Sequence, residues 1–188
     1  MNLSTESRDA GMTGAGATFS EVPAVEPIGA QSNTSELTDA GPLGRAPLSS
    51  AVEDYLKAIH TLGAASSAPV TTQALADHLN IAPASATNMA KRLAGMGLAH
   101  HTPYRGIELS ETGERIAVEV VRHHRIIETF LLEVLGLDAA KVHAEAERLE
   151  HVLSEEVEAL MMAKLGHPTL DPHGKPIPQS EELSTRPS

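Results

Sequence analysis

Cysteine is absent from all 188 residues of the chain. Disulfide bonds and zinc–thiolate sites are therefore excluded, and we expect a protein of the reducing cytoplasm. Aromatic residues make up only 2% of the chain, so a folded core must be aliphatic. The chain also lacks an apolar run near the roughly 18 residues of a membrane-spanning helix, and it lacks a glycine-rich phosphate loop. We therefore expect neither a membrane location nor a nucleotide cofactor.

The negative charge of the chain is unevenly distributed. A formal net charge of −11 argues at first against a nucleic-acid partner. However, no acidic residue lies between Asp77 and Glu108, and this window contains Lys91, Arg92 and Arg105. Because the local field governs docking more than the total charge does, DNA binding is compatible with the sequence.

Composition divides the chain into four parts. Residues 1–47 are rich in Gly, Ser, Thr, Ala and Pro without a sustained apolar period, and they are predicted to form a disordered tail with no secretory signal. Residues 48–110 and 111–166 are predicted to form two folded domains. Residues 167–188 are rich in proline and are predicted to form a second tail. The roughly 120 residues between the tails are enough for a hydrophobic core.

Helix-turn-helix spacing occurs within residues 48–110. One short helix, TQALADHLN, keeps its leucines on one face, and a second begins near Pro83 and ends near Gly97. Only the tight turn IAP separates them, as in a helix-turn-helix motif. Two short extended runs then flank residues 103–106, which predicts a β-hairpin. A hairpin directly after the second helix is a wing, so this region is predicted to be a winged helix-turn-helix DNA-binding domain.

The candidate DNA contacts are the outward positions of the second helix together with the loop of the hairpin. They are Pro83, Ala84, Ser85, Thr87, Asn88, Lys91, Arg92, Tyr104 and Arg105. Small and hydroxyl residues allow close approach to base edges, and Asn88 can pair with adenine or with a phosphate. Lys91, Arg92 and Arg105 can contact phosphates. The alternative is an ordinary helical hairpin with a solvated face.

Residues of metal-binding type share one face of a predicted helix that begins after Asp138. With about 100° of turn per residue, four of them fall within an arc of roughly 100°: His143, Glu147, Glu150 and His151. A second pair, His124 and Glu128, repeats the i, i+4 spacing in the preceding helix. Imidazole and carboxylate without thiol suit a divalent metal of intermediate hardness. Beside a predicted DNA-binding domain, such a site indicates a metal-sensing transcription factor.

Three other interpretations fit parts of the sequence. A Glu-rich helix is often simply solvated, and Glu145, Glu155 and Glu156 show that this region is acidic in any case. Two Glu and two His residues could hold the metal pair of a hydrolytic enzyme, but neither an H-E-x-x-H motif nor a nucleophile motif occurs. A structural or partner-binding helical protein would leave the helix-turn-helix and the wing unexplained. We therefore expect a regulator and not an enzyme.

Five segments of the chain together resemble one known family. They are VEDYLKAI, LADHLNIAPASATNMAKRLAGMGL, YRGIELSETG, HHRIIETFL and GLDAAKVHAEAERLEHVLSEEVE, in this order between about Ser49 and Pro178. The family is that of the diphtheria toxin repressor and the manganese transport regulators. The resemblance implies a mainly α-helical protein, with an N-terminal winged helix-turn-helix domain followed by an all-helical dimerisation and metal-binding domain. It further implies a homodimer that binds a double-stranded DNA operator and represses metal-uptake genes.

The resemblance also implies two metal sites. The primary site would consist of Asp54, Glu147, Glu150 and His151, and the ancillary site of His124, Glu128 and His143. Iron-type members tend to carry Met and Cys where this chain has Asp54 and Glu147. Because carboxylates are harder ligands than sulfur, Mn²⁺ is the expected cofactor. An Fe²⁺-dependent repressor of the same architecture and a metal-independent winged-helix regulator are the alternatives.

Two departures from the family pattern affect these sites. Where some manganese regulators have a further acidic ligand, this chain has Lys57, so a two-metal cluster of that kind is not expected. The chain is also too short for the third, SH3-like domain of many iron-type members, and we expect water or anions in place of any ligands from it.

The implied primary site draws on both domains. Asp54 lies in the first domain and the other three ligands lie in the second, so a bound metal would tie the domains together. Without it, three carboxylates would crowd one place and repel one another. The tie is expected to set the spacing of the two recognition helices in a dimer.

Overall fold

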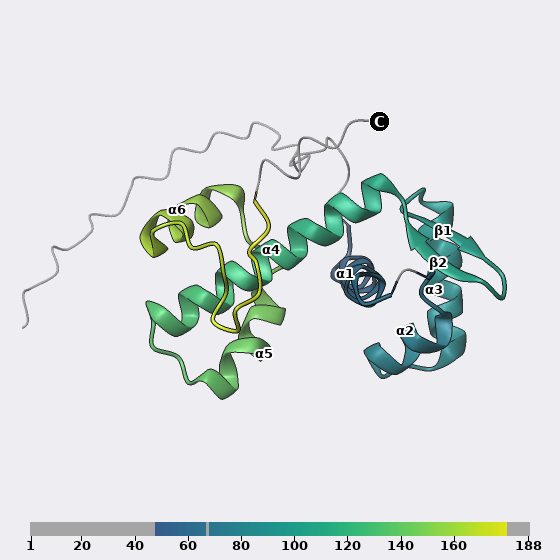
Figure 1. Cartoon of the computed structure of the whole chain (residues 1–188), viewed down its shortest axis with the longest axis horizontal. Helices are drawn as coiled ribbons and strands as arrows, with labels where there is room; N and C mark the ends of the chain where they lie inside the picture. Colours follow the sequence, from purple (N-terminus) through teal and green to yellow (C-terminus); the bar gives the residue numbers. More distant parts are fainter. Residues whose placement is uncertain (1–47, 67, 180–188) are drawn as a thin grey trace, which may run out of the picture. The chain divides into compact units, whose positions relative to one another are not determined.

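A computed structural model describes residues 48–66 and 68–179 (Figure 1). Their elements are α1 (Ser50–Ala64), α2 (Thr72–Leu79), α3 (Pro83–Gly95), β1 (Ala99–Thr102), β2 (Gly106–Leu109), α4 (Glu111–Glu133), α5 (Ala139–Leu149) and α6 (Glu155–Leu165). The predicted mainly α-helical fold with a winged helix-turn-helix is confirmed. The predicted tail of residues 1–47 lies outside the described residues, as do residues 180–188.

Helices α2 and α3 form the helix-turn-helix. The side chain of Thr71 caps α2 by accepting a hydrogen bond from the backbone N–H of Ala74. Asn80 then takes a left-handed conformation, with φ at 52°, which ends α2 and turns the chain. Pro83 occupies the first turn of α3, where its missing N–H leaves no bond unmade.

Strands β1 and β2 form the antiparallel hairpin that follows α3. Ala99 pairs with Leu109 and Thr102 with Gly106, so the loop at the tip is short. Val70, in the connection between α1 and α2, forms an isolated bridge with Ile107 of β2. The hairpin is therefore attached to the helical part of the domain along one edge.

The core of the first domain is aliphatic, as the scarcity of aromatic residues requires. Leu56 of α1, Leu75 of α2, Leu93 of α3 and Ile107 of β2 are all fully buried in one cluster. Burying a side chain of this size stabilises a fold by about 1.5–3 kcal/mol. These contacts hold α1 in a fixed place relative to the helix-turn-helix.

Helix α4 connects the two domains. The side chain of Ser110 caps it by accepting from the N–H of Gly113. A Cβ atom on Gly113 would lie only 2.0 Å from the carbonyl oxygen of Leu98, so this close approach requires glycine. Along its length α4 packs first against β2 and α1 and then against α5 and α6 (Figure 1).

Residues 167–179, which were predicted to belong to a tail, pack against α4. This segment, yellow in Figure 1, runs alongside α4, with Ile177 only 2% exposed. Arg122 and Arg125 of α4 donate hydrogen bonds to the carbonyls of Pro178 and Pro176. Proline carbonyls remain acceptors although proline has no N–H, so a proline-rich segment can be held by arginine side chains. Its composition alone did not reveal this packing.

Within residues 48–66 and 68–179, no helix combines the length and the apolar character needed to cross a bilayer.

Candidate metal centre

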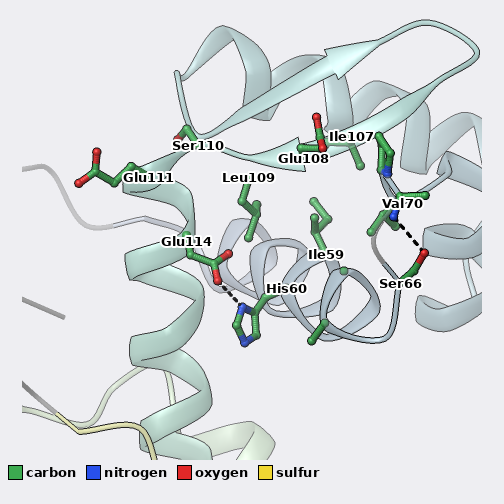
Figure 2. Close-up of a pocket in the computed structure, with 14 residues that line it drawn as sticks. Ile59, His60, Ser66, Val70, Ile107, Glu108, Leu109, Ser110, Glu111 and Glu114 are labelled. Atoms are coloured by element: carbon green, nitrogen blue, oxygen red, sulfur yellow. Dashed lines mark hydrogen bonds and ion pairs between the residues drawn. The ribbon is translucent and has the colours of Figure 1, made fainter. Parts of the chain in front are cut away.

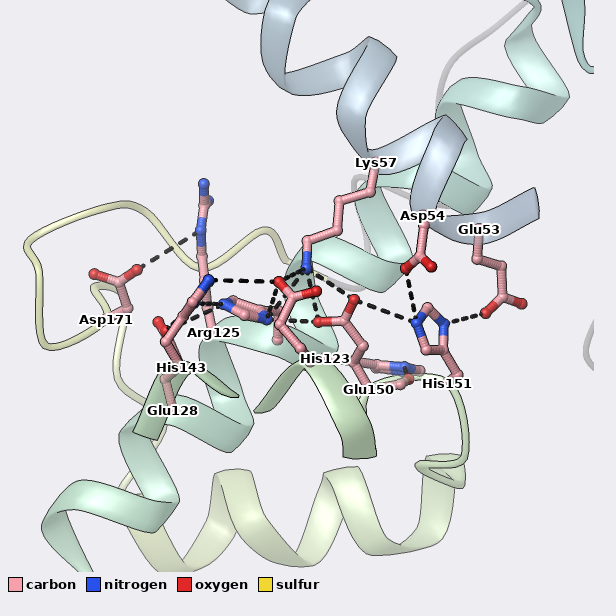
Figure 3. A network of polar contacts seen from close by, with 12 residues as sticks. Glu53, Asp54, Lys57, His123, Arg125, Glu128, His143, Glu150, His151 and Asp171 are labelled. Carbon is pink, nitrogen blue, oxygen red and sulfur yellow. Dashed lines mark hydrogen bonds and ion pairs between the residues drawn. The ribbon is translucent and has the colours of Figure 1, made fainter. Parts of the chain in front are cut away.

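Asp54, Glu150 and His151 form what we call the inner group. The Nε2 atom of His151 lies 3.0 Å from Oδ1 of Asp54 and 3.6 Å from Oε1 of Glu150 (Figure 3). Asp54 belongs to α1, whereas Glu150 and His151 lie at and beyond the end of α5. One ligand atom from each residue lies within 4.8 Å of the other two, close enough for a single metal ion.

The ring of His151 is held on both sides by α1. Its Nδ1 atom lies 2.6 Å from Oε2 of Glu53, which leaves Nε2 to face Asp54 and Glu150. Burial raises the pKa of Asp54, and the nearby carboxylates of Glu150 and Glu147 raise it further, while His151 acts in the opposite direction. The inner group thus brings carboxylates close together, and a bound cation would reduce the repulsion between them.

The predicted helix face is wrong at its C-terminal end. Helix α5 ends at Leu149, Glu150 is its C-cap, and His151 lies in the turn that follows. The chain must turn here because α6 begins only at Glu155. His151 is consequently directed toward α1 and not along the face that carries His143 and Glu147.

Glu147, predicted in the primary site, lies in a central group with His124 and Glu150, and this group shares Glu150 with the inner group. The ammonium of Lys57 lies 2.8 Å from Oε1 of Glu147 and 2.8 Å from both carboxylate oxygens of Glu150. Although burial acts to raise the pKa of Glu147, the hydrogen bond and charge of Lys57 lower it. Of the three carboxylates expected to crowd one place, Glu147 and Glu150 are thus paired with Lys57, whereas the charges of both still raise the pKa of Asp54.

His124, Glu128 and His143, predicted as the ancillary site, form the outer group. Oε1 of Glu128 lies 3.1 Å from Nε2 of His124 and 3.1 Å from Nδ1 of His143. Burial acts to raise the pKa of Glu128, but His124 and His143 lower it to about 2. For His124 the burial effect is downward, yet hydrogen bonds with Glu128 and Glu150 raise its pKa.

Two further ligand-type residues reach Glu128 from the C-terminal segment. His173 Nδ1 lies 3.4 Å from Oε2 of Glu128, and Asp171 completes a terminal group with them. Sequence reasoning missed both residues because it assigned this segment to a tail. The available signal was the Asp-x-His spacing within a stretch that already resembled the family.

The residues of these groups fit a divalent cation of intermediate hardness. All candidate ligand atoms are carboxylate oxygens or imidazole nitrogens. Glu150, although it has a carboxyl side chain, is only 1% exposed. A cavity of about 660 Å³ gives access to them, lined by Asp54, Lys57, Glu128, Glu147 and His173 among others. Buried carboxylates of this kind require a cation partner.

The predicted DNA-contact residues lie on α3 and on the hairpin loop. All of them are exposed except Thr87, which is half-buried and donates from Oγ1 to the carbonyl of Pro83. Tyr104 is fully exposed and has a positive φ of 64°, which is uncommon for a residue with a large side chain. The inward positions Ala86, Ala90 and Leu93 are buried, so α3 presents one free face.

A second cavity, of about 500 Å³, lies between α1, the hairpin and the start of α4 (Figure 2). Its polar lining includes His60, whose Nδ1 lies 2.8 Å from Oε1 of Glu114. Ile59, Val70 and Leu109 supply apolar lining. Within the described residues it contains none of the three-residue groups that could hold a metal ion, so the centre described above is the stronger candidate.

Two protein-family models match the chain. Residues 47–107 match the family described as iron dependent repressor, N-terminal DNA binding domain. Residues 110–179 match the family described as iron dependent repressor, metal binding and dimerisation domain. The two matches meet at the start of α4, between the hairpin and the metal-type groups.

Individual proteins match long stretches of the chain. An uncharacterized HTH-type transcriptional regulator of Methanocaldococcus jannaschii is 42% identical over 110 residues, which is 58% of this chain and 88% of the relative. Iron-dependent repressor IdeR of Mycobacterium bovis is 37% identical over 135 residues, 72% of this chain and 58% of the relative. The solved structure of a manganese-dependent transcriptional repressor complex with manganese has a TM-score of 0.64 and 41% identity, covering 69% of this chain and 59% of that chain. The chain thus spans less than two thirds of the length of the last two.

Proposed function

Because the chain belongs to the iron-dependent repressor family, we propose that it is a DNA-binding transcriptional repressor activated by Mn²⁺. The family consists of transcriptional repressors and not of enzymes, which removes the support for the hydrolytic interpretation of the sequence. The proposed site of action is the cytoplasm, in agreement with the absence of cysteine.

The observation that carries the proposal is the 3.0 Å approach of Asp54 to His151. These residues belong to the DNA-binding and dimerisation regions, so a ligand bound by both is sensitive to the orientation of the two regions. Coupling between an effector site and a binding surface requires this kind of differential contact. Coupling free energies of this type are typically about 1–3 kcal/mol.

The side chains of the inner group perform distinct tasks in this proposal. Glu53 orients the ring of His151, and Asp54 and Glu150 direct carboxylate oxygens toward its Nε2. A divalent cation supplies the positive charge that joins these carboxylates and the imidazole. Since Glu53 and Asp54 are consecutive in α1, any movement of α1 changes both contacts with His151.

The exposed face of α3 is proposed to read the operator. Asn88 faces outward and offers an amide for a base edge, while Lys91, Arg92 and Arg105 are exposed and offer positive charge to phosphates. Tyr104 at the hairpin tip is proposed to contact the sugar–phosphate backbone beside them. Lys91, Arg92 and Arg105 thus offer exposed positive charge in a chain that is acidic as a whole.

A second copy of the chain is the proposed partner of the second domain. Leu149, Val152, Val157 and Leu160 are between 41% and 75% exposed, and they lie on and between α5 and α6. Several exposed apolar side chains within one short stretch of sequence are consistent with a surface that a partner covers. A homodimer would place two recognition helices on one duplex, with their spacing set by the orientation of the domains.

Mn²⁺ is proposed over Fe²⁺ because of the ligand types. The inner group offers two carboxylates and an imidazole, and cysteine is absent from the chain. Asp54 carries this argument, since Glu147 is held by Lys57 in the central group. One compared structure is a manganese-dependent repressor, whereas IdeR is iron-dependent, so the metal has to be tested directly.

The test is operator binding at buffered free metal. A duplex selected from a random pool with the Mn²⁺-loaded protein serves as the probe, and its fluorescence anisotropy is followed with Mn²⁺, with anaerobic Fe²⁺, with Zn²⁺ and with chelator. We expect full binding with Mn²⁺ and its loss with chelator. Full binding with Fe²⁺ and only partial binding with Mn²⁺ would favour the iron alternative. Equal operator binding with metal and with chelator would support the alternative of a metal-independent regulator.

A further inference from the structure

The ligand-type groups form a continuous row in which neighbouring groups share one residue. Glu150 belongs to the inner and central groups, His124 to the central and outer groups, and Glu128 to the outer and terminal groups. Three cations at adjacent positions of such a row would lie close together and would share ligands. The chain therefore requires some means to determine which positions a metal can occupy.

Lys57 occupies the central position of this row (Figure 3). An ammonium has three N–H donors, and three carboxylate oxygens lie 2.8 Å from Nζ, one from Glu147 and two from Glu150. Nδ1 of His124 lies 3.2 Å from the same atom. The ammonium thus contacts every member of the central group at the place where a metal ion would have to bind.

Burial gives this ammonium a defined position. The side chain of Lys57 is 17% exposed and that of Glu150 is fully buried, so water does not compete freely for the contact. The ammonium also faces both carboxylates of the central group, Glu147 and Glu150, so its single positive charge offsets part of their negative charge. Removing one partner of a buried ion pair leaves an uncompensated charge, which is strongly destabilising unless another cation takes its place.

We propose that the ammonium of Lys57 is the built-in cation of the central group, and that it restricts divalent metal to the groups on either side. The proposal rests on the proposed function in one respect, that the flanking groups take a divalent metal. Lys57 comes from α1, whereas Glu147 and Glu150 come from α5. The same contact therefore joins the two domains before any metal adds to it, and the metal strengthens a junction that already exists.

The test counts metal ions per chain. Native protein, Lys57→Met and Lys57→Arg are dialysed against the same buffered free Mn²⁺, and bound manganese is measured by mass spectrometry. Lys57→Met removes the charge at similar length, and we expect it to bind one more Mn²⁺ per chain than the native protein binds. Lys57→Arg keeps a positive charge and should bind the native number. If Lys57→Met binds the same number of Mn²⁺ ions per chain as the native protein, the proposal is overturned.

A matched control removes a lysine from the same cavity. Lys175 lines that cavity and is exposed, and Lys175→Met should bind the native number of Mn²⁺. An additional Mn²⁺ in this variant as well would mean that general charge, and not the contact of Lys57, controls occupancy, and would overturn the proposal. A native protein that binds no Mn²⁺ would contradict the proposed function, but the difference between Lys57→Met and native protein still decides the role of Lys57.

A second measurement keeps the proposal testable if the Lys57→Met variant is too unstable without metal to be dialysed. The free energy of unfolding rises with the logarithm of free ligand concentration in proportion to the number of ligands bound. We expect a steeper dependence of thermal stability on free Mn²⁺ for Lys57→Met than for the native protein, by one additional ion. Parallel dependences would contradict the proposal even where dialysis fails.

Discussion

Oδ1 of Asp54 lies 3.0 Å from Nε2 of His151, and the opposite nitrogen of the same ring lies 2.6 Å from Oε2 of Glu53. One imidazole of the second domain is thus held on both sides by consecutive acidic residues of α1. These polar contacts add to an apolar one, because Ile116 and Ala117 of α4 belong to the same buried cluster as Leu56 of α1. A junction of this kind responds to the charge and occupancy of its ligands.

The orientation of His151 provides the first prediction. Glu53→Ala should weaken Mn²⁺ binding by about 10–100-fold, because loss of a partner that orients a ligand ring has effects of this size. Glu53→Gln keeps an acceptor for Nδ1 and should recover most of the affinity. Buffered-metal titration checks both, with the exposed Glu156→Ala as control. Native affinity in Glu53→Ala would show that Glu53 does not orient the ring.

The second prediction concerns the residues proposed to bind phosphates. Arg105→Ala should weaken DNA binding irrespective of sequence and reduce the slope of log affinity against log salt by about 0.9, because one phosphate is no longer neutralised. Lys91→Ala and Arg92→Ala should act in the same way. Mn²⁺ affinity of the free protein should remain unchanged, and the exposed Arg148→Ala on α5 serves as the control. If all three variants keep the native salt slope, these residues do not contact phosphates.

The third prediction follows from the lowered pKa of Glu128. In chelator, its ion pairs with His124 and His143 stabilise the fold above the ordinary pKa of 4.5, and this contribution is lost as the pH falls from 4.5 toward about 2. The difference in pKa corresponds to roughly 3 kcal/mol at most, before screening by solvent reduces it. Unfolding by denaturant should therefore show a smaller acid loss in Glu128→Gln than in the native chain, with exposed Glu133→Gln resembling the native chain. If the free energy of unfolding falls with pH in the same way for Glu128→Gln and the native chain, this role of Glu128 is contradicted.

The fourth prediction tests how α4 meets the hairpin. Gly113→Ala would place a Cβ atom 2.0 Å from the carbonyl oxygen of Leu98. We expect a loss of about 3 kcal/mol in the free energy of unfolding, since neither backbone can move easily. Gly95→Ala on α3 meets no atom within 4 Å and should stabilise the chain by about 0.5–1 kcal/mol. Equal effects of the two substitutions on thermal stability would contradict the packing described.

The fold could be predicted from the sequence because its signals are local. Asp138 and Ser154 stand directly before helix-forming runs, and each side chain accepts a hydrogen bond from the first turn of its helix. The turn between α2 and α3 and the alternating residues of the hairpin are also short-range features. Such signals do not depend on which elements meet later, so element type and order follow from them.

The composition of the metal-type groups could be predicted only in part. The i, i+4 spacing of His124 and Glu128 placed them together correctly, because both lie on α4. The contact of Glu147 with Lys57 joins two helices that are far apart in the sequence, and no spacing rule predicts it. The packing of residues 167–179 depends on arginines of α4, which a proline-rich composition does not reveal.

The most direct test of the central claim is operator binding by Asp54→Ala at limiting free Mn²⁺. This change removes the one inner-group ligand that α1 provides and leaves the buried core of the dimerisation domain intact. We predict that about tenfold or more additional Mn²⁺ is needed for half-maximal binding, while dimer size is unchanged and the exposed Asp77→Ala resembles native protein. Native activation of Asp54→Ala at the native Mn²⁺ concentration would show that the metal acts within the second domain alone.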